Sequence, residues 1–80
     1  MVTVLFFAGA RDAANASSRT YALPGQLTVG EFAALLLRDA PPLGPLLPYI
    51  RFAVNGKFVD LAHLLADGDE IAVMPPVSGG

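Results

Sequence analysis

The sequence contains no cysteine, and this absence excludes several kinds of chemistry at once. The chain can form no disulfide and no thiolate metal site, and it offers no thiol on which sulfur could be carried. Its single histidine, His63, has no companions of suitable type and spacing for a metal site or a catalytic triad. We therefore predict no metal site and interpret His63 as a surface or packing residue.

Charged residues are also scarce, at 15% of the chain against about 25% in an average domain. The five basic residues are scattered and form no stripe that could neutralise phosphates, so we predict no nucleic-acid partner. No apolar run approaches the roughly 18–20 residues of a membrane span. The apolar start, VTVLFFAGA, has no basic segment before it, and its removal would delete the strongest predicted strand. We therefore expect a cytoplasmic protein without a membrane partner.

Apolar residues, by contrast, make up 54% of the chain. An average domain has about 45–50% in a similar count that also includes glycine. An 80-residue chain forms one domain, and a domain near this size buries only about 60–65% of its unfolded surface. Two interpretations stay open: the excess forms a partner surface, or the many alanines inflate the figure.

Five short segments rich in β-branched and aromatic residues are predicted to be strands. The first of these segments has apolar side chains on both of the faces that alternate along a strand. This pattern is typical of a central strand. Asn55-Gly56 is the preferred sequence of a type I′ hairpin turn, and Asp67-Gly68 marks a further turn. The predicted strands cover residues 2–7, 19–23, 50–54, 57–59 and 70–74.

One segment has a clear helix start. Thr28 and Glu31 have the T-x-x-E spacing of a capping box, in which each side chain binds the backbone amide of the other residue. The helix should end near Asp39, because Pro41-Pro42 cannot continue it. A shorter helix or turn is expected at residues 10–16, and a helical turn at 61–65. Residues 41–48, PPLGPLLP, are predicted to lack regular structure and to lie flat against the domain edge.

The order of these elements predicts an α+β fold, because one main helix can cover only one face of a sheet. A mixed sheet of about five strands would grasp this helix, with the first and last strands side by side in the middle. Phe6, Ile71 and Val73 should then face the helix. Phe7 and Met74 should lie on the other face, which would be open to a partner.

The last predicted strand is followed by a short tail that begins with two prolines, Pro75-Pro76-Val77-Ser78-Gly79-Gly80. Two prolines end strand pairing and favour an extended chain. Six extended residues reach about 20 Å, at roughly 3.3 Å each. Because Gly79 and Gly80 have no side chains, they could enter a slot too narrow for other residues. We therefore predict a folded domain at residues 1–75 and a flexible tail at 76–80.

The carboxylate of Gly80 is a poor electrophile while it is ionised. Adenylation by ATP would give it a good leaving group, and a sulfur nucleophile could then displace AMP to leave a thiocarboxylate. The sequence has no glycine-rich phosphate loop with its lysine, so the activating enzyme must be a separate protein. We expect no cofactor on this chain, with ATP used by that enzyme.

Three stretches resemble the MoaD/ThiS sulfur-carrier family: DGDEIAVMPPVSGG at residues 67–80, the opening VTVLFFAGARD, and VNGKFV at 54–59. The likeness spans essentially the whole chain, and the tail is its most specific part. Within the family, the MPPVSGG ending is most similar to the small subunits of molybdopterin synthase.

This resemblance implies a ubiquitin-like β-grasp fold and a non-catalytic sulfur donor. Gly80 would be adenylated by an E1-like enzyme and receive sulfur from a desulfurase or rhodanese-type protein. It would then supply the dithiolene sulfurs of molybdopterin to a cyclic pyranopterin precursor, on the synthase large subunit. Phe7, Phe58 and Met74 fall where the family uses apolar residues to hold its partners. Met74 replaces the aromatic residue common at that place, and its flexible apolar side chain should preserve docking.

Three alternatives remain. The chain could carry sulfur for another product, such as thiamine thiazole, cysteine or thiolated tRNA. It could be a ubiquitin-like protein modifier whose Gly80 forms an amide with a lysine. It could also be an interaction module of the same fold with an inert tail.

Overall fold

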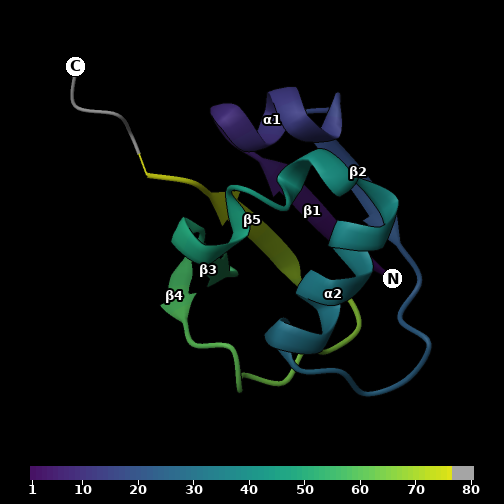
Figure 1. The fold of residues 1–80 in the computed structure, drawn as a ribbon. Helices are drawn as coiled ribbons and strands as arrows, with labels where there is room; N and C mark the ends of the chain where they lie inside the picture. The colour runs from purple at the N-terminus through teal and green to yellow at the C-terminus, as the bar shows by residue number, and fades with distance from the viewer. Residues whose placement is uncertain (77–80) are drawn as a thin grey trace.

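The computed structural model describes residues 1–76, which form a mixed five-stranded sheet with helices on one face (Figure 1). The strand order across the sheet is β2-β1-β5-β3-β4. β1 and β5 are parallel neighbours in the middle, and the other pairs are antiparallel. The strands are β1 (Val2–Phe6), β2 (Ser18–Tyr21), β3 (Arg51–Val54), β4 (Lys57–Val59) and β5 (Glu70–Met74). The predicted α+β fold and the central placement of the first and last strands are confirmed.

The main helix, α2 (Val29–Asp39), begins at the predicted capping box. The Glu31 amide donates to Thr28 Oγ1 at 3.1 Å, and the Thr28 amide donates to Glu31 Oε1 at 2.9 Å. The first two helical amides, of Val29 and Gly30, donate to the carbonyl oxygens of His63 and Leu61 at 2.8 and 2.9 Å. The helix start, which always leaves unpaired amides, is thus satisfied partly by its own cap and partly by a distant loop.

Gly30 lets that loop approach closely. A Cβ atom built on Gly30 would lie 3.3 Å from the Leu61 carbonyl oxygen and 3.4 Å from the Leu61 Cβ. This approach explains why residues 61–65 do not form the predicted helical turn. The Leu65 amide, which a helical turn would direct to the Leu61 carbonyl, instead donates to Leu27 O at 2.8 Å. Only a turn at 61–62 remains, followed by a single bridge between Leu64 and Thr28.

The prediction that residues 41–48 lack regular structure was wrong. They contribute to two 3₁₀ helices, η1 (Pro41–Leu43) and η2 (Leu47–Tyr49). Proline is accepted in the first helical turn because its missing N–H would have no partner there. The expected position against the domain is correct, since Leu43 is 1% exposed.

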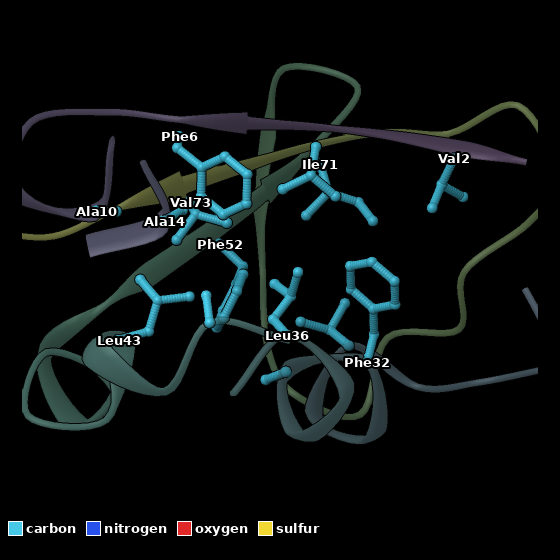
Figure 2. Close-up of a cluster of buried hydrophobic side chains, with 14 of the residues drawn as sticks. Val2, Phe6, Ala10, Ala14, Phe32, Leu36, Leu43, Phe52, Ile71 and Val73 are labelled. Atoms are coloured by element: carbon cyan, nitrogen blue, oxygen red, sulfur yellow. The ribbon is translucent and has the colours of Figure 1, made fainter. Parts of the chain in front are cut away.

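A second, short helix, α1 (Gly9–Ala14), follows β1, and its Ala10 and Ala14 join the core. Figure 2 shows the core between the sheet and the helical layer: Phe6, Ile71 and Val73 from the sheet meet Phe32 and Leu36 of α2. The predicted orientation of Phe6, Ile71 and Val73 is therefore confirmed. Within residues 1–76, no helix is both long and apolar enough to cross a bilayer.

Candidate docking face and the start of the tail

The sheet face opposite the helices is here called the open face. Alternation along each strand places every second residue on it. The register aligns Leu5, Ala72, Ala53 and Phe58 in one row across β1, β5, β3 and β4. The open face comprises Thr3, Leu5, Phe7, Ser18, Thr20, Arg51, Ala53, Phe58, Glu70, Ala72 and Met74.

The three residues expected to hold a partner all lie on the open face. Phe7 is 46% exposed and Phe58 is 58% exposed, while Met74 is half-buried. Phe7 directly follows β1, and its amide donates to the Val73 carbonyl at 3.2 Å, which places Phe7 beside Met74. The placement of Phe7 and Met74 on this face agrees with the prediction, and the role of all three residues in partner binding stays a prediction.

Sequence reasoning missed one functional candidate, Arg51. Its guanidinium lies over the Phe58 ring, 4.1 Å from the ring centroid, in a cation–π arrangement. Arg51 also pairs with Met74, the last residue of β5. The signal was available: the two-residue turn at Asn55-Gly56 fixes the hairpin register and so makes Arg51 the diagonal neighbour of Phe58.

The hairpin that presents Phe58 is held to the start of β5 by hydrogen bonds. Asn55 and Gly56 have φ angles of 51° and 85°, which confirms the predicted type I′ turn. The Asn55 side chain donates to Asp69 Oδ1 at 2.9 Å and accepts from the Glu70 amide at 2.9 Å. One side chain therefore fixes the hairpin to the start of β5.

The tail begins at the end of a central strand. β5 ends at Met74, as the two prolines predict, and Pro75 is buried while Pro76 is exposed. The tail starts beside Arg51 and Met74, at one end of the open face. The remaining residues predicted for the tail, Val77, Ser78, Gly79 and Gly80, lie outside the described residues.

A polar cluster on the helical side of the sheet serves the fold. Asp39 Oδ2 accepts hydrogen bonds from the Tyr21 hydroxyl and from Arg19 Nη1, each at 2.6 Å. The Tyr21 hydroxyl, followed by the Arg19 guanidinium, holds the pKa of Asp39 below its ordinary value. Burial, with the bond to Asp39, raises the pKa of Tyr21. The cluster ties the edge strand β2 to the end of α2.

His63 is exposed, as expected of a surface residue, and its contribution to the fold is its backbone carbonyl. In the described part of the chain, no three His, Asp or Glu residues gather in a way that could hold a metal ion.

Comparison with known proteins identifies the family of this chain. The model of the ThiS family matches residues 4–80. This protein belongs to the ThiS family. Among curated relatives, the molybdopterin synthase sulfur carrier subunit of Chlamydomonas reinhardtii is 32% identical, with 99% of this chain and 98% of the relative covered. The human protein of the same name is 34% identical, with 99% and 93% covered.

Solved structures show that this ThiS family member has the ubiquitin-like β-grasp fold. SAMP1 from Haloferax volcanii has a TM-score of 0.87 at 29% identity, with 99% of this chain and 98% of the other covered. A putative molybdopterin converting factor subunit 1 from Pyrococcus furiosus gives 0.85 at 26% identity, with 95% and 97% covered. A chain from the complex of subunits 1 and 2 of the Helicobacter pylori molybdopterin-converting factor gives 0.71 at 29%, with 99% and 97% covered.

Proposed function

We propose that this protein is the sulfur carrier subunit of a molybdopterin synthase and that it carries sulfur on the carboxyl group of Gly80. One observation carries the proposal: the chain is similar from end to end to curated subunits of that name. The PPVSGG tail, which follows a central strand beside an exposed apolar face, supplies the chemistry that such a subunit needs.

The chemistry needs little from the folded domain itself. A carboxylate oxygen of Gly80 attacks the α-phosphate of ATP and releases pyrophosphate, and a sulfur nucleophile then displaces AMP. ATP is used by an E1-like activating enzyme, and a desulfurase or rhodanese-type protein supplies the sulfur. This chain contributes the acyl group of Gly80. Because Gly79 and Gly80 have no side chains, this end of the chain could enter a narrow active site.

Delivery of the sulfur requires docking on the large subunit of the synthase. The open face supports this step, because Phe7, Phe58 and Met74 offer exposed apolar surface next to the start of the tail. An exposed patch of this kind is typical of an interaction site. Sulfur would then pass to a cyclic pyranopterin precursor and form the dithiolene. The cytoplasmic location of the protein stays a prediction.

Intact-mass measurement tests the carrier role. The starting mass first verifies that the chain ends at Gly80. After incubation with ATP, an activating enzyme and a sulfur donor, we expect one oxygen to be exchanged for sulfur in the final peptide. A chain that lacks Gly79 and Gly80 is the matched control and should gain nothing. Addition of the large subunit and the pterin precursor should then yield the dithiolene, and its absence would favour carriage for another product.

A second candidate function is protein modification, because the chain is also similar to SAMP1, a small archaeal modifier protein. In that role Gly80 would form an amide with a lysine of a target protein. Higher-mass adducts in a lysate that vanish when Gly80 is deleted would support it.

A further inference from the structure

The open face is apolar at its centre, and Arg51, at the end where the tail begins, is the one cation among its described residues. Among the described strand residues of this face, the one carboxylate is Glu70, at the opposite end of β5. Glu70 and Met74 are four residues apart, which corresponds to about 13 Å along a strand. The face therefore has a direction: positive beside the tail and negative at the far end.

Phe58 holds the Arg51 side chain in place. The guanidinium lies 4.1 Å from the ring centroid, and the two residues are diagonal neighbours in the β3–β4 hairpin. An arginine stacked on an aromatic ring is partly desolvated and already oriented, so less conformational entropy is lost when it binds. A partner that covers Phe58 must also cover this guanidinium.

Arg51 forms no ion pair within residues 1–76, although Asp60 lines the same pocket. The two ion pairs in this part of the chain join Met1 to Asp67 and Arg19 to Asp39. Asp60, which would stand opposite Arg51 if β4 continued, accepts instead from the Ala62 amide at 3.0 Å. As far as the described residues go, the Arg51 guanidinium is thus available to a carboxylate of a partner.

We propose that Arg51 determines the partner choice and orientation of the open face, because it requires a carboxylate on the docked protein opposite its guanidinium. The inference rests on the proposed function, in which a partner covers this face. An apolar patch alone gives affinity with little orientation, whereas a buried guanidinium without a counter-charge is costly. A carboxylate in the right place fixes one orientation, the one that directs the tail into the partner's site.

The test measures the dissociation constant of the full-length protein for the molybdopterin synthase large subunit of the same organism. Three variants separate charge from packing: Arg51→Leu, Arg51→Lys and Arg51→Glu. The matched control is Arg38→Glu, which makes the same charge change on an exposed residue of the helical layer. Circular dichroism verifies that each variant is folded.

We expect Arg51→Glu to weaken binding by roughly 30-fold or more, as is typical when one partner of a buried charge pair is lost. Arg51→Leu should lose less, Arg51→Lys should retain most of the affinity, and Arg38→Glu should stay within a few-fold of wild type. Replacement of the facing carboxylate of the large subunit by lysine should restore binding of Arg51→Glu.

The outcomes separate the two claims. If wild type binds and Arg51→Glu binds as Arg38→Glu does, the role of Arg51 is wrong and the proposed function stands. If no partner carboxylate restores binding when changed to lysine, the charge pair is also rejected. If wild type itself does not bind the large subunit, the proposed function fails and the inference fails with it.

Discussion

Thr28 is the residue on which the start of α2 most depends. Its hydroxyl accepts from the Glu31 amide, and its own amide donates back to the Glu31 carboxylate. Replacement of such a cap by alanine typically costs about 1 kcal/mol. We therefore expect Thr28→Ala to lower the free energy of unfolding by about that amount, measured by urea denaturation. Thr20→Ala, an exposed threonine on β2, is the comparison, and equal losses in both variants would reject the capping argument.

The Tyr21–Asp39 contact makes stability depend on pH. Because the pKa of Asp39 is lower in the folded protein than its ordinary value of 3.8, the ionised carboxylate stabilises the fold. That contribution is present above the unfolded pKa and is lost as pH falls through the folded pKa. Tyr21→Phe removes the first cause of the shift, so we expect it to be less stable than wild type at neutral pH. The difference in unfolding free energy between the two proteins should be smaller in acid.

Chemical denaturation of both proteins at about pH 7 and about pH 2 measures this gap. Asp39→Asn serves as the reference, because it removes the titrating group itself. A gap that keeps its size across this range would mean that Tyr21 acts only through packing against Phe32, whose ring meets it edge-on at 5.6 Å.

At the scale of elements, the proline-rich connection is part of the folded core. Leu43 of η1 is 1% exposed and belongs to the same cluster as Phe32 and Ile71. Truncation of a buried leucine to alanine costs about 2–5 kcal/mol. We expect Leu43→Ala to destabilise the protein by an amount in that range. Leu64→Ala, at a side chain that is 52% exposed, should change little. Thermal unfolding of these two variants tests this expectation. Equal midpoints would show that the proline-rich connection is not anchored in the core.

The elements were predictable where their signals are local. The capping box at Thr28 and Glu31, the Asn55-Gly56 turn and the prolines at 41–42 and 75–76 each act within a few residues. The segment at 61–65 was mispredicted because its backbone bonds are distant. Its carbonyls serve the start of α2, and the Leu65 amide binds Leu27. A sequence pattern within these five residues cannot reveal hydrogen bonds to residues that are distant along the chain.

Some residues of the candidate site were likewise predictable from local signals, and one was not. Alternation and strand order sufficed to place Phe7 and Met74 on the open face. Arg51 required the hairpin register, which brings its guanidinium over Phe58. A rule that considers each strand separately cannot find a pair that two strands create.

For the whole molecule, the described core and the proposed chemistry involve separate parts of the chain. Among residues 1–76, the buried hydrophobic core runs from Val2 to Val73. Deletion of Gly79 and Gly80 should therefore leave the unfolding midpoint unchanged, while it abolishes formation of the thiocarboxylate. Calorimetry and intact mass on the same preparation measure both. A large fall in the midpoint would show that the tail contributes to the fold.

The origin of the tail on β5, a strand with neighbours on both sides, has a mechanical consequence. A protein that grips the end and pulls along the strand loads the β1 and β3 ladders together, in shear rather than one bond at a time. A tail attached to an edge strand would peel away under the same load. We therefore expect the domain to resist unfolding when a partner pulls on its tail.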